Sequence, residues 1–345
     1  MIARAARRVL SGTAAAVDRA VLSTIYATRG QSPELGHRQK LELLEGCARL
    51  YADCAPLFRA PRAIQPDVRA VRTGREPGVY DLAWPSGFVP HCEEVRPTYD
   101  RSAANRIAAC RLYLHPEPRP IAVVLHGYMS GHYGFEERAW PLRGLYASGL
   151  DLALFVLPFH GLRGEGWLGT PPFPGPDPRI GNEGFRQAVA DLGDLKAWLS
   201  SRGHPAVGLM GMSLGAYTAS LGATVFDDLA FLIGTIPLAS IADFARERGR
   251  LGRDPVLANE LYRALDRAYR PTSPLHRPPQ IAGDRVLLLA AEADRITPVS
   301  HARRLARHFD ARLEILPGSH LLQLGRASGL RHTRAFLAGL GICRA

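Results

Sequence analysis

Hydrophobic residues follow two alternating patterns along most of this chain. Short apolar runs rich in Val, Ile and Leu are separated by longer segments in which apolar residues recur at helical spacing. The first pattern is typical of strands buried on both faces, and the second of amphipathic helices. Their alternation from residue 66 onward predicts a mostly parallel central sheet flanked by helices. The expected strands are Val68–Arg72, Ile107–Leu114, Ile121–Leu125, Leu150–Leu157, Ala206–Met210, Leu229–Ile236, Arg285–Ala291 and Leu313–Leu316.

Helical periodicity fills the segments between these strands. Glu183–Leu199 is the clearest case, because its apolar residues fall on one face of a helix. Further helices are expected at residues 136–148, after Thr297–Pro298, and at Leu321–Leu340.

Two long insertions interrupt the alternation. Residues 158–181 are rich in Gly and Pro, contain Trp167 and Phe173, and leave the carboxyl end of an expected strand, where open α/β sheets bind ligands. Residues 238–283 separate the sixth and seventh expected strands and contain the helical segments Ile241–Leu251 and Val256–Tyr269.

Residues 1–65 precede this pattern and are expected to form a helical extension. Residues 1–30 contain five arginines and a single acid, a composition similar to that of a mitochondrial transit peptide. Ser32–Pro33 is a typical start for a helix that continues through Leu41, Leu44 and Leu50. An apolar stripe at helical spacing precedes it, made up of Val17, Val21 and Ile25. Three interpretations stay open: packing on the following domain, contact with a membrane surface, or a cleaved targeting segment.

Charge is the compositional feature that most changes this picture. The net charge is +11, and all but two of the 43 basic residues are arginines. Codon usage in a GC-rich genome would explain this, and an anionic partner such as a phospholipid headgroup or an acidic acyl substrate is the alternative. Basic clusters interleaved with aromatic residues are not evident, so we expect no nucleic-acid partner. No run of 18 apolar residues predicts a transmembrane helix.

The five cysteines are scattered and form no C-x-x-C pair. They are Cys47, Cys54, Cys92, Cys110 and Cys343. This pattern favours reduced thiols in a cytoplasmic protein over a disulfide framework or a zinc site. We therefore expect neither a metal nor a cofactor.

Candidate chemistry follows four of the apolar runs. Gly211-Met212-Ser213-Leu214-Gly215 is a G-x-S-x-G pattern between an apolar run and a small-residue helix, so a sharp turn would lift the Ser213 hydroxyl to the end of a sheet. The expected strand Ile121–Leu125 ends in His126-Gly127-Tyr128, a small loop that can aim N–H groups at a developing oxyanion. Two late strands are followed by Asp294 and by His320.

With serine, acid and histidine in this chain order, residues 66–345 resemble the α/β-hydrolase superfamily. The resemblance implies a catalytic triad of Ser213, Asp294 and His320. It also implies an oxyanion hole formed by the backbone N–H groups of Leu214 and Tyr128. A narrower likeness is to the branch of abhydrolase-domain-containing protein eighteen. It rests on Leu157-Pro158-Phe159-His160-Gly161 and on the helical amino-terminal extension.

The same resemblance suggests which residues surround the substrate. Residues 238–283 lie where hydrolases of this fold often carry a lid. His126, His160 and Met212 are the candidate substrate-binding residues, although family members use the position of His126 to shape the loop. His160 either packs within its loop or contacts the substrate, and Glu292 is the substitute acid if Asp294 only ends a helix.

The implied function is a lipase-like serine hydrolase that cleaves a carboxylic ester or thioester through an acyl-enzyme. Acyl transfer or peptide hydrolysis on the same triad is one alternative, and a non-catalytic binding protein with the hydrolase fold is another. The expected partner is a small acyl ester or thioester. A peripheral membrane contact stays open, as does the oligomeric state.

Overall fold

The structure is a computed structural model that describes residues 18, 35–52, 54–74, 76–166 and 170–344. Its centre is a nine-stranded sheet with the order β1-β2-β3-β5-β4-β6-β7-β8-β9. The strands are β1 (Asp67–Arg72), β2 (Gly78–Pro85), β3 (Ile107–Leu114), β4 (Ile121–Leu125), β5 (Asp151–Phe155), β6 (Val207–Met212), β7 (Leu232–Thr235), β8 (Val286–Ala291) and β9 (Arg312–Leu316). Strands β1, β2 and β3 pair antiparallel with their neighbours, and β5, β4, β6, β7, β8 and β9 run parallel. The predicted mostly parallel sheet is therefore confirmed.

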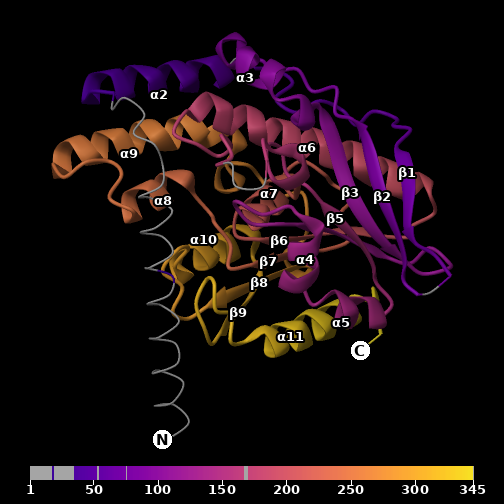
Figure 1. The fold of residues 1–345 in the computed structure, drawn as a ribbon. Helices are drawn as coiled ribbons and strands as arrows, with labels where there is room; N and C mark the ends of the chain where they lie inside the picture. Colours follow the sequence, from indigo (N-terminus) through magenta and orange to yellow (C-terminus); the bar gives the residue numbers. More distant parts are fainter. Residues whose placement is uncertain (1–17, 19–34, 53, 75, 167–169, 345) are drawn as a thin grey trace, which may run out of the picture.

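Helices cover both faces of this sheet (Figure 1). The apolar side chains of α6 (Pro178–Ser201), α7 (Leu214–Gly222) and α10 (Val299–Phe309) pack on one face. Those of α5 (Leu142–Ala147) and α11 (Arg326–Gly339), with Tyr133 of α4 (Tyr133–Ala139), pack on the other. The strands between the two layers are buried on both sides, which explains why β4 and β8 are continuous apolar runs in the sequence.

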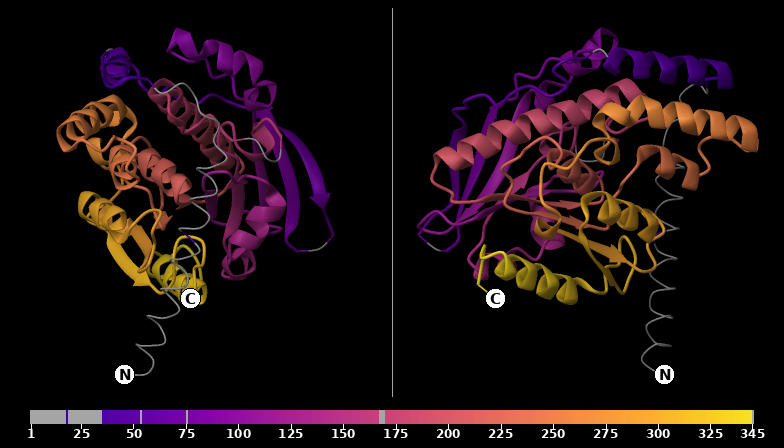
Figure 2. Two further views of the ribbon diagram at one scale, coloured as in Figure 1. Left: turned by 60° about the vertical axis from the view of Figure 1, so that its left-hand side comes forward. Right: turned by 180° about the vertical axis from the view of Figure 1, so that it is seen from behind.

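The amino-terminal part of the chain contributes α2 (His37–Ala52), which lies beside α9 (Pro255–Tyr269) in Figures 1 and 2. The helix begins at His37 and not directly after Ser32–Pro33. Gly36 precedes it, and the Gln39 side chain accepts a hydrogen bond from the Gly36 N–H at 2.9 Å, which satisfies one of the donors that a helix start leaves free. The predicted stripe of Val17, Val21 and Ile25 lies outside the described residues.

Other differences from the predicted elements have local causes. The sequence pattern missed β2, so the sheet has nine strands where eight were expected, and residues 238–283 lie between β7 and β8. Pro141 divides the helix expected at residues 136–148 into α4 and α5. The closing helix begins at Arg326 because the Gly325 N–H bonds back to the Pro317 carbonyl and keeps the residues before it in a loop.

The insertion at residues 238–283 contains α8 (Ile241–Glu247) and α9, so its first helix ends four residues earlier than Leu251. In the insertion at residues 158–181, Phe173 is fully buried against Phe185 of α6 and the His160 ring. Trp167 lies outside the described residues. No helix within the described part of the chain is long and apolar enough to cross a membrane. A short helix, α3 (Arg96–Arg101), completes the fold on the side of β3.

Parallel strands have one further consequence. The carboxyl ends of β4, β6, β7, β8 and β9 meet at the same edge of the sheet. The loops that follow these strands therefore gather the candidate residues that the sequence analysis singled out.

Candidate active site

Ser213 occupies the sharp turn between β6 and α7, with φ 56° and ψ −113°. L-residues rarely adopt this conformation, so the turn is strained and must be held by its surroundings. The Ser213 N–H donates to the Thr235 carbonyl at 3.0 Å, and the Ser213 carbonyl accepts from Tyr217 and Leu238. These bonds fix the backbone while the side chain stays partly exposed.

The two glycines of the motif are required by close backbone approach. A methyl group on Gly211 would lie 2.3 Å from the carbonyl oxygen of Gly215, and one on Gly215 would lie 2.1 Å from that of Leu125. Both distances are far below van der Waals contact. The absence of side chains thus allows α7 to approach the end of β4 and to present Ser213 beside the loop that follows this strand.

His320 and Asp294 lie next to Ser213 and form one hydrogen-bonded series with it. His320 Nε2 is 3.0 Å from Ser213 Oγ, and His320 Nδ1 is 2.8 Å from Asp294 Oδ2. His320 is 9% exposed and Asp294 is 5% exposed, so the imidazole and the carboxylate are shielded from water. In this geometry the imidazole can accept the serine proton while the carboxylate holds the opposite nitrogen.

Asp294 is held by its own loop. Its Oδ1 accepts hydrogen bonds from the backbone N–H groups of Ile296 at 2.7 Å and Thr297 at 2.8 Å, a turn stabilised by an aspartate side chain. The Thr297 hydroxyl lies 2.9 Å from the Ile236 carbonyl and 3.1 Å from Asp294 Oδ2. Sequence reasoning placed Thr297 at a helix start only, yet it also fixes the carboxylate. The Asp-x-x-Thr spacing is the pattern that indicates this role.

The loop after β4 runs alongside Ser213. A methyl group on Gly127 would lie 3.7 Å from Ser213 Cβ, so this backbone is in contact distance of Ser213. Leu214 is the first residue of α7, and its N–H consequently has no acceptor within the helix. Tyr128 follows Gly127 and donates its hydroxyl to the Pro171 carbonyl at 3.3 Å, which ties this loop to the insertion at residues 158–181.

His126 and His160 lie beneath this loop, where both side chains are buried. His126 Nε2 accepts from the Leu157 N–H at 3.0 Å, so its Nδ1 carries the proton that it donates to the Gly127 carbonyl at 2.7 Å. Burial lowers the pKa of His126 to about 3, and it lowers the pKa of His160 to about 4. Both imidazoles are therefore neutral near pH 7 and face backbone groups.

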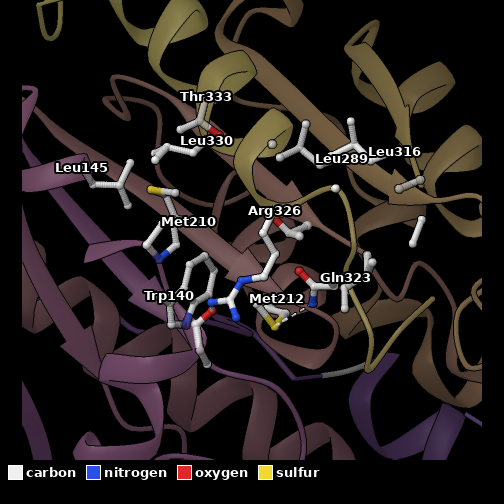
Figure 3. Close-up of a pocket in the computed structure, with 18 of the residues that line it drawn as sticks. Trp140, Leu145, Met210, Met212, Leu289, Leu316, Gln323, Arg326, Leu330 and Thr333 are labelled. Atoms are coloured by element: carbon white, nitrogen blue, oxygen red, sulfur yellow. Dashed lines mark hydrogen bonds between the residues drawn. The ribbon is translucent and has the colours of Figure 1, made fainter. Parts of the chain in front are cut away.

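Met212 lines an apolar cavity of about 60 Å³ beside the turn of Ser213 (Figure 3). Met210, Leu289 and Leu316 also line it, and the side chains of Gln323 and Arg326 lie close to Met212. The Gln323 amide contacts the Met212 sulfur at 3.6 Å. Ser213 and His320 do not line the cavity, but Met212, the residue directly before Ser213, does.

The structure thus brings Ser213, Asp294 and His320 into contact, and the Gly127 backbone lies within contact distance of Ser213. It places Asp294, and not Glu292, against the imidazole. It does not bring His126 and His160 to the surface of the site.

Other chemistries find less support in the described part of the chain. No group of three or more His, Cys, Asp or Glu side chains there is arranged to hold a metal ion. The five cysteines are free thiols, and burial raises the pKa of Cys47 to about 12 and that of Cys92 to about 11. Neither of these two thiols would ionise readily as a nucleophile.

Solved structures with this architecture include two esterases. The acetyl xylan esterase from Paenibacillus sp. R4 aligns over 91% of this chain and 98% of its own, with a TM-score of 0.53 and 14% identity. Acetyl xylan esterase 1 from Thermoanaerobacterium sp. JW/SL YS485 aligns over 87% and 93%, with a TM-score of 0.52 and 15% identity. At such identities the likeness concerns the fold, which is that of the α/β hydrolases.

Two curated proteins of Mycobacterium tuberculosis are similar in sequence, whereas no protein-family model matches the chain. The uncharacterized protein MT2702 of strain CDC 1551 is 34% identical over 264 residues, which are 73% of this chain and 62% of that protein. The uncharacterized protein Rv2627c of strain H37Rv is 34% identical over 296 residues, which are 83% of this chain and 68% of that protein. The chain therefore has the α/β-hydrolase fold and belongs to the same family as Rv2627c of Mycobacterium tuberculosis.

Proposed function

We propose that the protein is a serine hydrolase that cleaves a carboxylic ester or thioester. The observation that carries this proposal is the continuous hydrogen bonding from Ser213 through His320 to Asp294, at 3.0 and 2.8 Å. A structural serine in a turn would need neither a strained backbone nor a buried imidazole aimed at its hydroxyl. The esterases among the solved structures of this fold agree with an ester as substrate.

Acylation begins with attack of Ser213 Oγ on the carbonyl carbon of the substrate. His320 Nε2 accepts the serine proton as the new bond forms, and Asp294 stabilises the imidazolium. The carbonyl oxygen becomes an oxyanion, which accepts hydrogen bonds from the N–H groups of Leu214 and Tyr128. His320 then gives the proton to the departing alcohol or thiol, and the acyl group remains on Ser213.

Deacylation repeats these steps with water. His320 removes a proton from the water as its oxygen attacks the acyl carbon, and the same two N–H groups stabilise the second oxyanion. Collapse of this intermediate returns the proton to Ser213 Oγ and releases the carboxylic acid. His126 supports the oxyanion loop, because it is neutral and bonded to the Gly127 carbonyl and the Leu157 N–H. His160 is also neutral and bonds to the Pro158 carbonyl of its own loop.

The acyl group has an apolar space available next to the nucleophile. Met212 precedes Ser213 and lines the cavity of about 60 Å³, whose walls are mostly aliphatic. We place a short acyl chain at this cavity, with Met212 and Gln323 at its entrance. Enlarging Met210, which also lines the cavity, with Met210→Trp should therefore shift the preference toward shorter chains.

Active-site labelling tests the proposal directly. A fluorophosphonate probe should label the wild type and Ser213→Ala should remain unlabelled, whereas Ser220→Ala, which removes a buried serine of the same helix, should label normally. Turnover on a panel of p-nitrophenyl esters and acyl thioesters should disappear only in the Ser213 variant. Equal labelling of Ser213→Ala and the wild type would overturn the assignment.

The same panel separates the remaining alternatives. An acyltransferase would release product faster when an alcohol or amine acceptor is added to water, and a peptidase would cleave amide substrates of the panel. A binding protein without activity would show neither labelling nor turnover.

A further inference from the structure

A carboxylate from far outside the strands of the sheet contacts both loops of the candidate triad. Asp18 Oδ1 accepts hydrogen bonds from Ser319 Oγ at 2.9 Å and from the Leu321 N–H at 3.0 Å. Its Oδ2 accepts from the His320 N–H at 3.0 Å and from the Arg295 N–H at 3.2 Å. One side chain thus joins the loop after β8 to the loop after β9.

The environment of this carboxylate is unusual for a structural acid. Asp18 is fully buried, and each of its oxygens accepts two hydrogen bonds. All four donors are neutral backbone or hydroxyl groups. Among the residues that the structure describes, no lysine or arginine forms an ion pair with it. Burying a carboxylate is costly unless hydrogen bonds replace its water. The four hydrogen bonds therefore indicate that the surrounding groups are arranged to bind this carboxylate.

The bonds end on backbone atoms that set the triad geometry. One holds the N–H of His320 itself, whose ring must keep Nε2 at 3.0 Å from Ser213 Oγ. Another holds the N–H of Arg295, the residue directly after the acid. A displacement of either loop by about 1 Å would break the serine contact and can cost on the order of 10²-fold in rate.

We propose that Asp18 is a positioning residue of the triad, which fixes the spacing between the acid loop and the histidine loop. This inference rests on the proposed hydrolase function. Asp18 is 302 residues from His320 in sequence and belongs to the predicted amino-terminal extension, not to the predicted domain at residues 66–345. Catalysis by that domain therefore depends on a residue outside it.

The substitution Asp18→Asn tests the proposal with little change in shape. An amide nitrogen cannot accept a hydrogen bond, so two of the four donors would face another donor. We expect kcat and the rate of fluorophosphonate labelling to fall about 10-fold or more, while KM stays within about threefold of wild type. A role in stability alone would lower the melting temperature and leave both rates per folded molecule unchanged.

Asp151 provides a matched control. It is also fully buried and accepts from the backbone N–H groups of His115 at 2.8 Å and Arg119 at 3.1 Å, but it begins β5 at the opposite end of the sheet. Asp151→Asn should lower the melting temperature and keep kcat within about twofold of wild type, after normalisation to folded protein.

The outcomes are distinct. Wild-type kcat and labelling in folded Asp18→Asn would overturn the proposal, as would an equal loss in Asp151→Asn. If Asp18→Asn does not fold, Ser319→Ala decides. It removes the hydroxyl donor to Oδ1, together with the acceptor of the longer bond from the Leu322 N–H at 3.3 Å, and leaves the carboxylate in place. A lower kcat at unchanged KM supports the positioning role, and a wild-type kcat overturns it. If the fluorophosphonate probe does not label the wild type, both the hydrolase function and this inference are rejected. If the probe labels the wild type and Asp18→Asn equally, only this inference is rejected.

Discussion

Buried carboxylates on α6 and at the candidate site carry their charge in different ways. On α6, Asp191 Oδ2 lies 2.8 Å from Arg163 Nη2, with both side chains fully buried, and Asp194 Oδ2 lies 2.6 Å from Arg59 Nη2. At the site, Asp294 and Asp18 accept hydrogen bonds from backbone N–H groups, hydroxyls and one imidazole. Within the described residues neither of these two forms an ion pair with lysine or arginine.

The difference follows from what each charge has to do. A guanidinium neutralises a carboxylate and fixes its position, so such a pair joins elements such as α6 and the loop after β5. Neutral donors solvate a carboxylate but leave its negative field in place, and that field can stabilise an imidazolium that forms next to it. An arginine at Asp294 would remove the reason for placing an acid there.

The largest expected effect comes from removing the uncompensated charge at the site. Asp294→Asn keeps the size of the side chain but favours the wrong His320 tautomer, so kcat on a p-nitrophenyl ester should fall about 10³-fold or more. Asp191→Asn should keep its kcat per folded molecule. Steady-state kinetics with the folded fraction determined by circular dichroism measures both. Near-normal kcat in Asp294→Asn would show that another carboxylate serves His320.

The next expected effect is on stability, and it comes from the buried ion pair between Arg163 and Asp191. Arg163→Met leaves the Asp191 carboxyl group buried without its partner, and Arg163 also donates to the carbonyls of Val156 and Asn105. We expect a loss of about 3 kcal/mol or more in the free energy of unfolding, measured by urea denaturation. Arg38→Met breaks an exposed pair with Glu42 and should cost less than about 1 kcal/mol. Similar losses in the two variants would show that the buried pair contributes no more to stability than the exposed one.

The proposed triad could be predicted from the sequence because each member follows an apolar run that forms a parallel strand. Chain order then places Ser213, Asp294 and His320 at one edge of the sheet, where the structure brings them into contact. The strand β2 escaped detection because Asp81 interrupts its apolar positions, Pro77 precedes it and Pro85 is its last residue.

Contacts across long sequence separations were not accessible in the same way. Nothing in the neighbourhood of Asp18 indicates that its carboxylate meets residues near position 320, since no local spacing reports such a contact. Thr297 was assigned to a helix start from its neighbour Pro298, and its bond to the Ile236 carbonyl depends on the packing of β7 beside β8. Such positions are specified by tertiary structure and not by local pattern.

The smallest expected effect concerns the buried His126. It extends the comparison from carboxylates to imidazoles. His320 has Asp294 beside it, whereas the charged or titratable groups that act on His126 are His160, His132 and Arg163, and each of these lowers its pKa. Burial contributes most, and the pKa of His126 falls from its ordinary value of 6.5 to about 3. The hydrogen bond to the Gly127 carbonyl favours the protonated form of His126 but does not offset these effects.

This depression determines the direction of the pH dependence. The unfolded chain binds a proton at His126 below pH 6.5, and the folded protein does so only near pH 3, so the contribution to stability is complete above pH 6.5 and is lost as the pH falls toward 3. Between pH 7 and pH 5.5 we expect His126 to account for a loss of about 1 kcal/mol in the free energy of unfolding. His126→Gln keeps an acceptor for the Leu157 N–H and a donor for the Gly127 carbonyl but cannot titrate. Urea denaturation at the two pH values should therefore give a smaller loss in His126→Gln than in wild type, and an identical loss would mean that His126 is not the group that the fold keeps neutral.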